Sequence, residues 1–345
     1  SKVGLHPDEI TIADVLKQKD YATCMIGKWH IGDKPQTLPT AQGFDTYFGL
    51  PYSNDMARQK EWGNDAESLD KIWRLKKFDI YDNEIYRDEK IVEKPVNQVT
   101  LTDRYTDEAV KFIKSNHTKP FYLHFCHAMP HVPLFVGDDR YDPDPHEAYR
   151  LTIEHIDHSV GRIMQTLEDL GVADNTLLIY TSDNGPWLSK KHHRGSALPL
   201  RAGKATTYEG GMRVPCVMRW PAGIVENKTC HEVAATIDIL PTIAKIVGAD
   251  LPVDRPIDGR EITGLFKDAN AKSPHESEGF YYYRNMKVEA VRIGHFKLHF
   301  KKPAQLYDLS KDVSETHNLA ETLPQLVSSM TRQADNYHQK LISEK

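Results

Sequence analysis

The feature that most constrains the fold is a regular alternation of amphipathic segments with short apolar runs. Apolar residues recur with helical spacing in four segments, residues 10–19, 102–114, 149–170 and 234–247. Mostly apolar runs of strand length occupy residues 21–26, 120–126, 176–181 and 213–219. Such strands are typical of parallel sheets that are buried on both faces, because helices cover each side. The sequence therefore predicts an α/β fold whose mixed, mainly parallel sheet lies between helices.

The pattern changes after about residue 265. Short strand-like segments joined by tight turns occupy residues 279–283, 288–293 and 296–300, and a helix is expected from about residue 323. A chain of 345 residues also exceeds a typical single domain. We therefore expect an α/β domain over residues 1–265. Residues 266–345 are expected to form a small domain with an antiparallel sheet plus one helix.

Charge and hydropathy narrow the classes of partner. The chain has 44 Lys and Arg against 49 Asp and Glu, a net charge of −5, so its surface offers no general basic field for nucleic acid. An anionic substrate would have to meet a local positive pocket. No run of about 18 apolar residues is present, which predicts no membrane span, and no signal peptide is recognised at Ser1. The 17 histidines favour an enzyme, because imidazole can bind metals, move protons and donate to anions.

The four cysteines show no metal-binding spacing. Cys24 and Cys126 lie in apolar runs and are predicted to be buried thiols. A disulfide between Cys216 and Cys230 is left open by the sequence.

Lys28 and His30 follow the apolar run of residues 21–26, after a glycine that allows the chain to turn. If the backbone stays extended, the two side chains point to the same side. One then supplies a permanent positive charge and the other a proton that moves near neutral pH, which together suit an anion. The alternative is a strand end with a solvated lysine and a loop histidine.

Two further loops begin where apolar strands end. Asp183 and Asn184 follow such a strand, and a carboxylate beside an amide oxygen suits a hard cation such as Ca²⁺. Asp-Asn-Gly is equally a common turn sequence. His127 and His131 follow another strand in a loop stiffened by proline, where they can donate to an anion or move a proton. Loop histidines without a role are the alternative there.

The most specific stretch is residues 201–213, which contains Lys204 among small residues. Its glycines allow the backbone to approach a ligand closely. His192, His193 and Arg194 lie just upstream and either rim the same pocket or are solvated. Positive donors that converge around a hard cation are the arrangement that stabilises charge on a sulfuryl or phosphoryl group.

These stretches resemble the type I sulfatases. Residues 21–30 match the second signature of that family, whose core is Gly-Lys-x-His, although Asp20 stands where the signature usually opens with Gly. Further segments look like the family and occur in its order, namely residues 42–49, 181–185, 203–211, 305–309 and 318–320. The most similar group is that of the arylsulfatases and N-acetylgalactosamine-6-sulfatases. The resemblance implies an alkaline-phosphatase-like fold and a sulfuric ester hydrolase.

The resemblance implies a catalytic role for each matching residue. Lys28, His131 and Lys204 would hold the sulfate oxygens. His30 would assist the catalytic hydroxyl when the sulfated enzyme breaks down. His131, alone or together with Lys204, would protonate the leaving oxygen. Ser53 resembles a serine on the substrate side of the site.

The resemblance also implies cofactors. Asp183 and Asn184 would be two of the Ca²⁺ ligands, but the paired N-terminal aspartates that complete the family's calcium site are missing. The family's nucleophile is a formylglycine made from the Cys or Ser of Cys/Ser-x-Pro/Ala-x-Arg, and no such motif occurs here. The simplest account is an N-terminally truncated sulfatase, and we expect this chain by itself to be inactive.

The sequence thus predicts a calcium-dependent sulfatase acting on a small-molecule or glycan sulfate ester, either of a sulfated carbohydrate or of an aryl alcohol. The polar residues 52–100, which contain two tryptophans, are expected to form part of the binding rim and would suit a sulfated sugar. The first alternative is a phosphatase or phosphonate hydrolase of the same superfold, and the second is a non-catalytic sulfate-binding protein. Family habit implies a secreted, periplasmic or lysosomal protein, and the oligomeric state is left open.

Overall fold

The computed structural model describes residues 4–343. The chain groups into two compact units. The first contains the chain up to Thr176 together with Ser189–Gly195 and Ile243–Pro252. The second contains Leu177–Leu188, Ser196–Thr242 and the chain from Val253 onward. The domain boundary between residues 265 and 266 stays a prediction.

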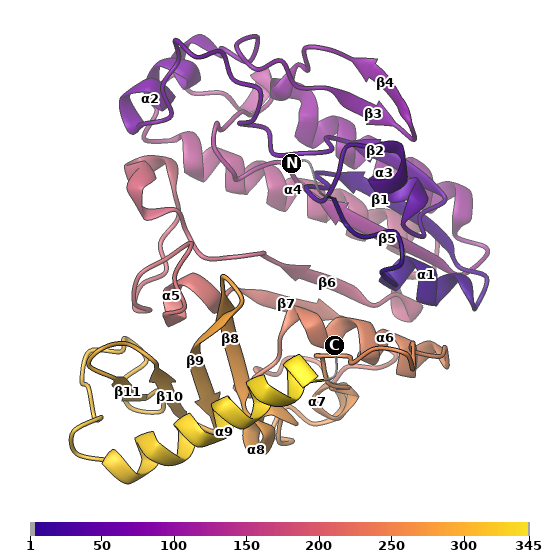
Figure 1. Cartoon of the computed structure of the whole chain (residues 1–345). Helices are drawn as coiled ribbons and strands as arrows, with labels where there is room; N and C mark the ends of the chain where they lie inside the picture. The colour runs from indigo at the N-terminus through magenta and orange to yellow at the C-terminus, as the bar shows by residue number, and fades with distance from the viewer. Residues whose placement is uncertain (1–3, 344–345) are drawn as a thin grey trace. The chain divides into compact units, whose positions relative to one another are not determined.

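A five-stranded sheet in the order β4-β3-β2-β1-β5 forms the centre of the first unit (Figure 1). β1 pairs in parallel with β2 on one side and with β5 on the other, while β3 and β4 extend the sheet in antiparallel fashion. The strands are β1 Ala22–Gly27, β2 Thr46–Gly49, β3 Ile85–Arg87, β4 Lys90–Glu93 and β5 Phe121–Cys126. The strands expected at residues 21–26 and 120–126 are therefore confirmed, and β2 to β4 are additions that the sequence did not predict. The burial expected of the second strand is not found: β5 is half-buried, because it lies at the edge of this sheet.

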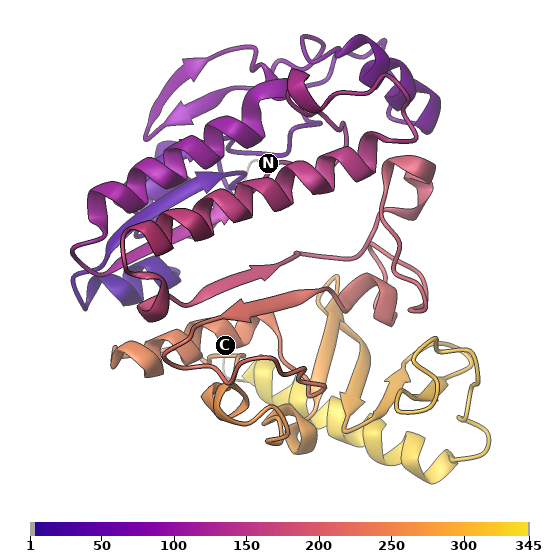
Figure 2. The same cartoon turned by 180° about the vertical axis from the view of Figure 1, so that it is seen from behind.

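Helices cover both faces of β1. Met25 packs in one cluster with Ala13 of α1, whereas Cys24 and Ile26 point to the opposite face, toward Phe112 of α3. α3 lies along α4 on the face of the sheet that is turned toward the viewer in Figure 2. α1 begins with a capping box between Thr11 and the first turn of the helix. The helices of this unit include α1 Ile12–Lys17, α2 Ala66–Leu75, α3 Leu101–Asn116 and α4 Ala148–Asp169.

The second unit contains a separate antiparallel pair, β6 Leu178–Thr181 with β7 Cys216–Arg219. The strands expected in these two segments are present, but the burial expected of them is wrong. Val217 is 62% exposed, and the other side chains of the pair are half-buried or exposed. The physical reason is that two paired strands cover neither of their own faces.

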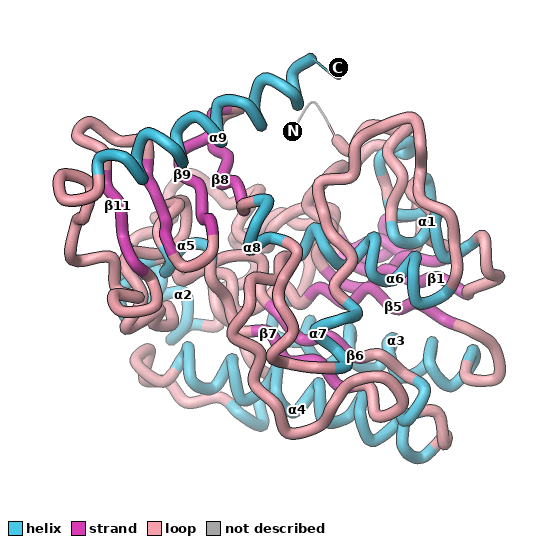
Figure 3. Tube along the Cα trace, turned by 90° about the horizontal axis from the view of Figure 1, so that it is seen from below, coloured by secondary structure: helices cyan, strands magenta, loops and turns pink. Residues whose placement is uncertain are grey.

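An antiparallel sheet in the order β11-β10-β9-β8 packs against α9, which crosses its strands (Figure 3). Val291, Leu298 and Leu306 form its core together with Met330 and Ala334 of the helix. The predicted small antiparallel sheet plus helix is confirmed. Its elements are β8 Phe280–Arg284, β9 Lys287–Ile293, β10 Phe296–His299, β11 Gln305–Asp308 and α9 Pro324–Ser343. The remaining helices are α5 Glu209–Met212, α6 Ile239–Val247, α7 Thr263–Lys267 and α8 His275–Glu278.

Candidate active site

The end of β1 places Lys28 and His30. Gly27 has φ +103°, and a Cβ at this position would lie 1.8 Å from the carbonyl oxygen of Cys126. Only glycine allows such a close approach of two strands. Beyond it, the Lys28 amide donates to the Cys126 carbonyl at 2.8 Å, and the His30 amide donates to the Pro51 carbonyl at 2.9 Å. The residues after β1 are therefore held between the loops that follow β5 and β2.

The extended backbone expected from Lys28 to His30 is not found, because His30 has φ +67°. A left-handed residue turns the chain, so strand alternation does not set the directions of these two side chains. His30 is exposed and its ring lies 6.1 Å, edge to face, from the ring of Tyr52. Its position is thus determined by the loop after β2.

His131 contacts the loop after β2 with its imidazole. Its Nδ1 lies 2.8 Å from the carbonyl oxygen of Val132, and because a carbonyl only accepts, Nδ1 carries the proton. The Ser53 hydroxyl lies 3.3 Å from the same nitrogen, and an Asp55 carboxylate oxygen lies 3.8 Å from it. A carboxylate at this distance attracts a protonated imidazole. The structure therefore brings the predicted residues Ser53 and His131 together and adds Asp55, which the sequence did not single out.

A buried amide network holds these two loops together. The Asn54 side-chain amide donates to the Pro133 carbonyl at 3.0 Å and to the Gln98 side-chain oxygen at 3.2 Å. Gln98 and Asn83 in turn donate to the Asn54 carbonyl at 3.0 Å and 2.9 Å. Asn54 is fully buried, and the hydrogen bonds of its side-chain nitrogen and of its main-chain carbonyl restrict the loop to one arrangement. No local pattern in the sequence points to these residues, because the Gln98 and Pro133 partners of Asn54 lie 44 and 79 positions away.

His127 precedes His131 in the same loop but differs from it. Both of its ring nitrogens are buried and have no hydrogen-bond partner among residues 4–343. Burial, with a smaller contribution from His155, lowers the pKa of His127 to about 4. His127 is therefore neutral near pH 7 and packs inside the protein, which corresponds to the reading of a loop histidine without a chemical role.

Asp183, Asn184 and Lys204 lie on two adjoining loops of the second unit. The Gly185 amide donates to the Gly211 carbonyl at 3.0 Å, and the Lys204 amide donates to the Pro186 carbonyl at 2.9 Å. A Cβ at Gly185 would lie 1.8 Å from the Gly210 carbonyl oxygen. The glycines of both motifs are thus explained by the contact between the two loops.

The side chains on these loops have the chemistry of a cation site and an anion site. Asp183 is exposed, and a carboxylate next to the Asn184 amide oxygen fits Ca²⁺, although the two supply only part of the roughly 6–8 oxygens that this ion takes. The Lys204 ammonium lies 5.2 Å from the centre of the Trp187 ring, which holds it by a cation–π contact. Trp187 is a further residue that the sequence did not single out.

A buried ionic network anchors the segment that carries Lys204. Lys297 of β10 donates to Glu209 at 2.7 Å and lies 3.5 Å from Glu315. Glu315 also contacts His299 at 2.7 Å and accepts from the Glu209 backbone amide at 2.7 Å. Burial opposes ionisation of Glu315, but His299 and Lys297 outweigh it and hold its pKa below the usual value. The segment that follows Lys204 is therefore fastened to the C-terminal antiparallel sheet.

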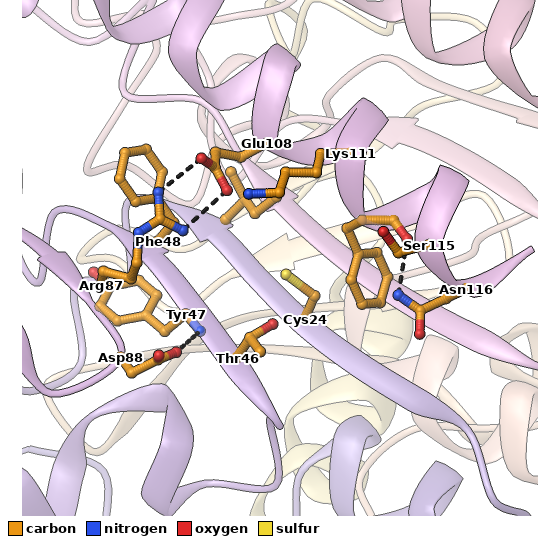
Figure 4. Close-up of a pocket in the computed structure, with 12 residues that line it drawn as sticks. Cys24, Thr46, Tyr47, Phe48, Arg87, Asp88, Glu108, Lys111, Ser115 and Asn116 are labelled. Carbon is orange, nitrogen blue, oxygen red and sulfur yellow. Dashed lines mark hydrogen bonds and ion pairs between the residues drawn. The ribbon is translucent and has the colours of Figure 1, made fainter.

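A cavity of about 230 Å³ lies between β1, β2 and α3, away from the predicted residues (Figure 4). An ion pair between Arg87 and Glu108, at 2.7 Å, borders it. Cys24 lines it as well, and burial raises the pKa of this thiol to about 12, so the sulfur stays protonated. Cys24 is buried as expected and Cys126 is half-buried. The four cysteines, all among the described residues, are free, which closes the question of a Cys216–Cys230 bridge for this structure.

Together, the loops of the first unit gather one group of predicted residues, Lys28, His30, Ser53 and His131. The loops of the second unit gather the other group, Asp183, Asn184 and Lys204. The sulfate-binding and calcium-binding roles of these residues remain predictions. His192 and His193 contact Asp70 of α2, and His193 is buried, so it is not solvated. That His192, His193 and Arg194 rim the same pocket stays a prediction.

Residues 2–249 match the family model of the sulfatases, and residues 203–340 match the model described as N-sulphoglucosamine sulphohydrolase, C-terminal. The chain belongs to the sulfatase family. Both groups of predicted residues lie inside the first match. The resemblance drawn from the motifs is therefore confirmed.

Curated relatives agree with this assignment. Mouse (Mus musculus) arylsulfatase G is 38% identical over 281 residues, which cover 75% of this chain and 53% of that protein. Human (Homo sapiens) arylsulfatase A is 32% identical over 360 residues, which cover 92% of this chain and 68% of that protein. The chain thus spans about half the length of the first of these sulfatases.

Solved structures confirm the alkaline-phosphatase-like fold. The crystal structure of Ps i-CgsB in complex with k-i-k-neocarrahexaose is similar with a TM-score of 0.81 and 29% identity, over 98% of this chain and 76% of that one. Phosphonate monoester hydrolase SpPMH from Silicibacter pomeroyi shares the fold alone, with a TM-score of 0.65 and 15% identity. No helix formed by residues 4–343 is both long and apolar enough to cross a membrane.

Proposed function

We propose that this member of the sulfatase family hydrolyses a sulfate ester. The observation that carries the proposal is the family match over residues 2–249, which contains every residue that the motifs single out for sulfate and Ca²⁺. Phosphate ester hydrolysis remains the first alternative, since a phosphonate hydrolase shares the fold. Sulfate binding without turnover is the second.

In this proposal the cations of both groups bind one sulfate. Lys28 and Lys204 supply permanent positive charge, which stabilises the charge that develops on the sulfate oxygens. His131 protonates the leaving oxygen. Its Nδ1 proton is already engaged by the Val132 carbonyl, so the transferable proton is the one on Nε2, and Asp55 supports the protonated ring. His30 assists the hydroxyl from which sulfate is released.

Two groups that the resemblance implies complete the chemistry. Asp183 and Asn184 would hold Ca²⁺ in part, and the ion would supply positive charge that draws electron density from the sulfate. A formylglycine would supply the attacking oxygen. The 345 residues contain no Cys/Ser-x-Pro/Ala-x-Arg motif from which formylglycine is made, and we propose that this chain by itself does not turn over.

For the substrate class we propose a sulfated carbohydrate. Support comes from the similar Ps i-CgsB structure, whose complex contains a neocarrahexaose, and from the Tyr52 ring, which lies beside His30. An aryl sulfate is the alternative that the arylsulfatase relatives favour. We further propose a secreted, periplasmic or lysosomal location, as the family resemblance implies.

The test compares ester hydrolysis by the protein expressed from its complete gene with hydrolysis by the 345-residue chain. Release of 4-nitrophenol from 4-nitrophenyl sulfate is measured beside release from 4-nitrophenyl phosphate. We expect the complete protein to hydrolyse the sulfate ester. Lys204→Ala should lower its kcat/KM by at least about 100-fold. Lys228 is an exposed lysine of the same unit, and Lys228→Ala should leave kcat/KM unchanged.

Each alternative has its own outcome in this assay. Faster turnover of the phosphate than of the sulfate would favour the phosphatase. Binding of the sulfate without turnover by the complete protein would favour the binding protein. Sulfate release by the 345-residue chain above that of its own Lys204→Ala variant would contradict the inactivity that we propose for it.

A further inference from the structure

A second cluster of ligand-type side chains lies in the first unit, apart from the residues discussed above. Asp70 comes from α2, and His192 and His193 come from the bent segment Leu188–His193. One ligand atom from each of the three residues lies within 4.8 Å of the others. The Nε2 atoms of His192 and His193 lie 2.6 Å and 2.8 Å from the same Asp70 carboxylate oxygen.

We propose that Asp70, His192 and His193 form a binding site for Zn²⁺. Two imidazole nitrogens and one carboxylate oxygen are ligands that Zn²⁺ prefers, whereas Ca²⁺ takes oxygen alone. Three protein ligands leave a fourth tetrahedral position for water. The three atoms already point at one place, so a small outward shift of each side chain would suffice for coordination.

The surroundings of the cluster suit a metal site. The His193 side chain is 1% exposed, while those of Asp70 and His192 are 21% and 23% exposed, so the cluster is partly shielded but open to an entering ion. The His192 ring stacks on His146, with centroids 4.3 Å apart, which limits the directions that its Nε2 can take. Stacking and burial thus orient the two imidazoles before any ion arrives.

The protonation states also suit coordination. Burial opposes ionisation of Asp70, but hydrogen bonds from His193 and His192 outweigh it, so the pKa of the carboxyl lies below its usual value. Burial lowers the pKa of His193. Near neutral pH the carboxylate is therefore charged and this imidazole is neutral, which are the forms that bind a metal.

The site would fasten one particular segment. Ser189–Gly195 belongs to the first unit, although the chain on either side of it belongs to the second. Lys190 donates to the Asn64 carbonyl, and Lys191 has the strained angles φ 53° and ψ −117°. In sequence this segment lies between Asp183 and Lys204. Bound Zn²⁺ would hold the segment against α2 in addition to this hydrogen bond.

The test is a titration of the metal-free 345-residue chain with Co²⁺ followed by Zn²⁺, in the presence of excess Ca²⁺ that fills sites made of oxygen alone. Co²⁺ bound by nitrogen and oxygen ligands in a four-coordinate site shows intense visible absorption bands. We expect one equivalent of Co²⁺ to bind and Zn²⁺ to displace it. The affinity for Co²⁺ should fall by more than about 100-fold in His192→Gln, because even the loss of a group that only supports a metal ligand lowers metal affinity by about 10–100-fold. His158→Gln, an exposed histidine of α4, serves as the control and should bind as the unchanged chain does.

A second variant separates coordination from folding. Asp70→Asn keeps an oxygen that accepts from both histidines but loses the charge, so the metal-free variant should melt close to the unchanged chain while its affinity for Co²⁺ falls. Zn²⁺ should raise the melting temperature of the unchanged chain and leave that of Asp70→Asn unaltered. Absence of Co²⁺ bands, or an affinity for Co²⁺ in His192→Gln and Asp70→Asn equal to that of the unchanged chain, would show that the cluster is only a hydrogen-bonded contact. The readout involves no ester hydrolysis, so the result is independent of the proposed function.

Discussion

Gly27 illustrates how one residue determines the position of another. The carbonyl oxygen of Cys126 occupies the space that a Cβ would need, and the amide of Lys28 donates to that same oxygen. The lysine is thus held at the end of β1 only because its neighbour has no side chain. The glycine of the Gly-Lys-x-His motif is therefore a requirement of the backbone, and the lysine and histidine are the parts available for chemistry.

We expect Gly27→Ala to destabilise the first unit by at least about 2 kcal/mol, because the methyl group would clash with backbone and φ is positive. Gly161→Ala in α4 is the matched control, since no atom lies within 4 Å of its Cβ position. It should be neutral or stabilising by up to about 1 kcal/mol. The check is the urea dependence of unfolding followed by far-ultraviolet circular dichroism. Equal stability of the two variants would contradict the assigned role of Gly27.

His127 predicts a pH dependence of stability. Its folded-state pKa of about 4 lies below the ordinary value of 6.5, so the unfolded chain binds the proton more readily. The stability that neutral His127 contributes is present above pH 6.5 and is lost as the pH falls toward 4, by at most about 3 kcal/mol. We expect the stability difference between the unchanged chain and His127→Gln to shrink over this range. Melting temperatures of both proteins from pH 7 to pH 4.5 test this, and a constant difference would show that His127 does not titrate as described.

At the scale of elements, α5 and β10 are joined by charges that have no access to water. Glu209 is 2% exposed, and the side chains of Lys297 and Glu315 are fully buried. Removing one member of such a network leaves its partners uncompensated. The C-terminal sheet therefore supports the segment that carries Lys204, although no residue of that sheet belongs to the predicted site.

We expect Lys297→Met to destabilise the second unit by about 3–5 kcal/mol, because two buried carboxylates lose their counter-charge. Lys287→Met, on the exposed side of β9, should change stability by no more than about 0.5 kcal/mol. Adding Glu209→Gln to Lys297→Met should recover part of the loss, since one unpaired charge is removed. Thermal unfolding of the four proteins provides the measurement. No recovery in the double variant would indicate that packing rather than charge explains the loss.

At the scale of the whole molecule, the predicted site draws on both compact units. Lys28 and His131 belong to the first, and Asp183, Asn184 and Lys204 belong to the second. In the proposed function, Lys28 and Lys204 bind the same sulfate. Two lysines that act on the same charged group should show coupled effects when they are replaced.

A double-mutant cycle on the complete protein tests this coupling. Lys28→Ala and Lys204→Ala should each lower kcat/KM by at least about 100-fold, and the double variant should lose less than the product of the two effects. The pair Lys204→Ala with Lys228→Ala serves as the control and should be additive. Strict additivity of Lys28→Ala and Lys204→Ala would show that the two lysines act on separate groups.

Local patterns predicted the helices and strands in which apolar residues recur over several positions of one segment. The stripe of apolar residues that became α4 and the apolar run that became β5 each extend over several residues, so hydrophobic periodicity was sufficient. β2, β3 and β4 have only three or four residues each, which is too short for a periodic pattern. The expected burial of β6 and β7 was wrong, because burial depends on what packs against a strand and not on its own composition.

By itself, the sequence determined the α/β class, the small antiparallel sheet and the sulfatase family, and it predicted the residues that would bind sulfate and Ca²⁺. These conclusions rest on periodicity and motifs, which are local properties of the chain. Only the tertiary structure decided that His127 is buried and neutral, that Asn54 ties the loops of the first unit together and that Asp70 meets two histidines. The reason is physical. Burial, hydrogen-bond partners and the electrostatic environment of a side chain are set by segments far away in the sequence, and no local pattern records which of them will meet.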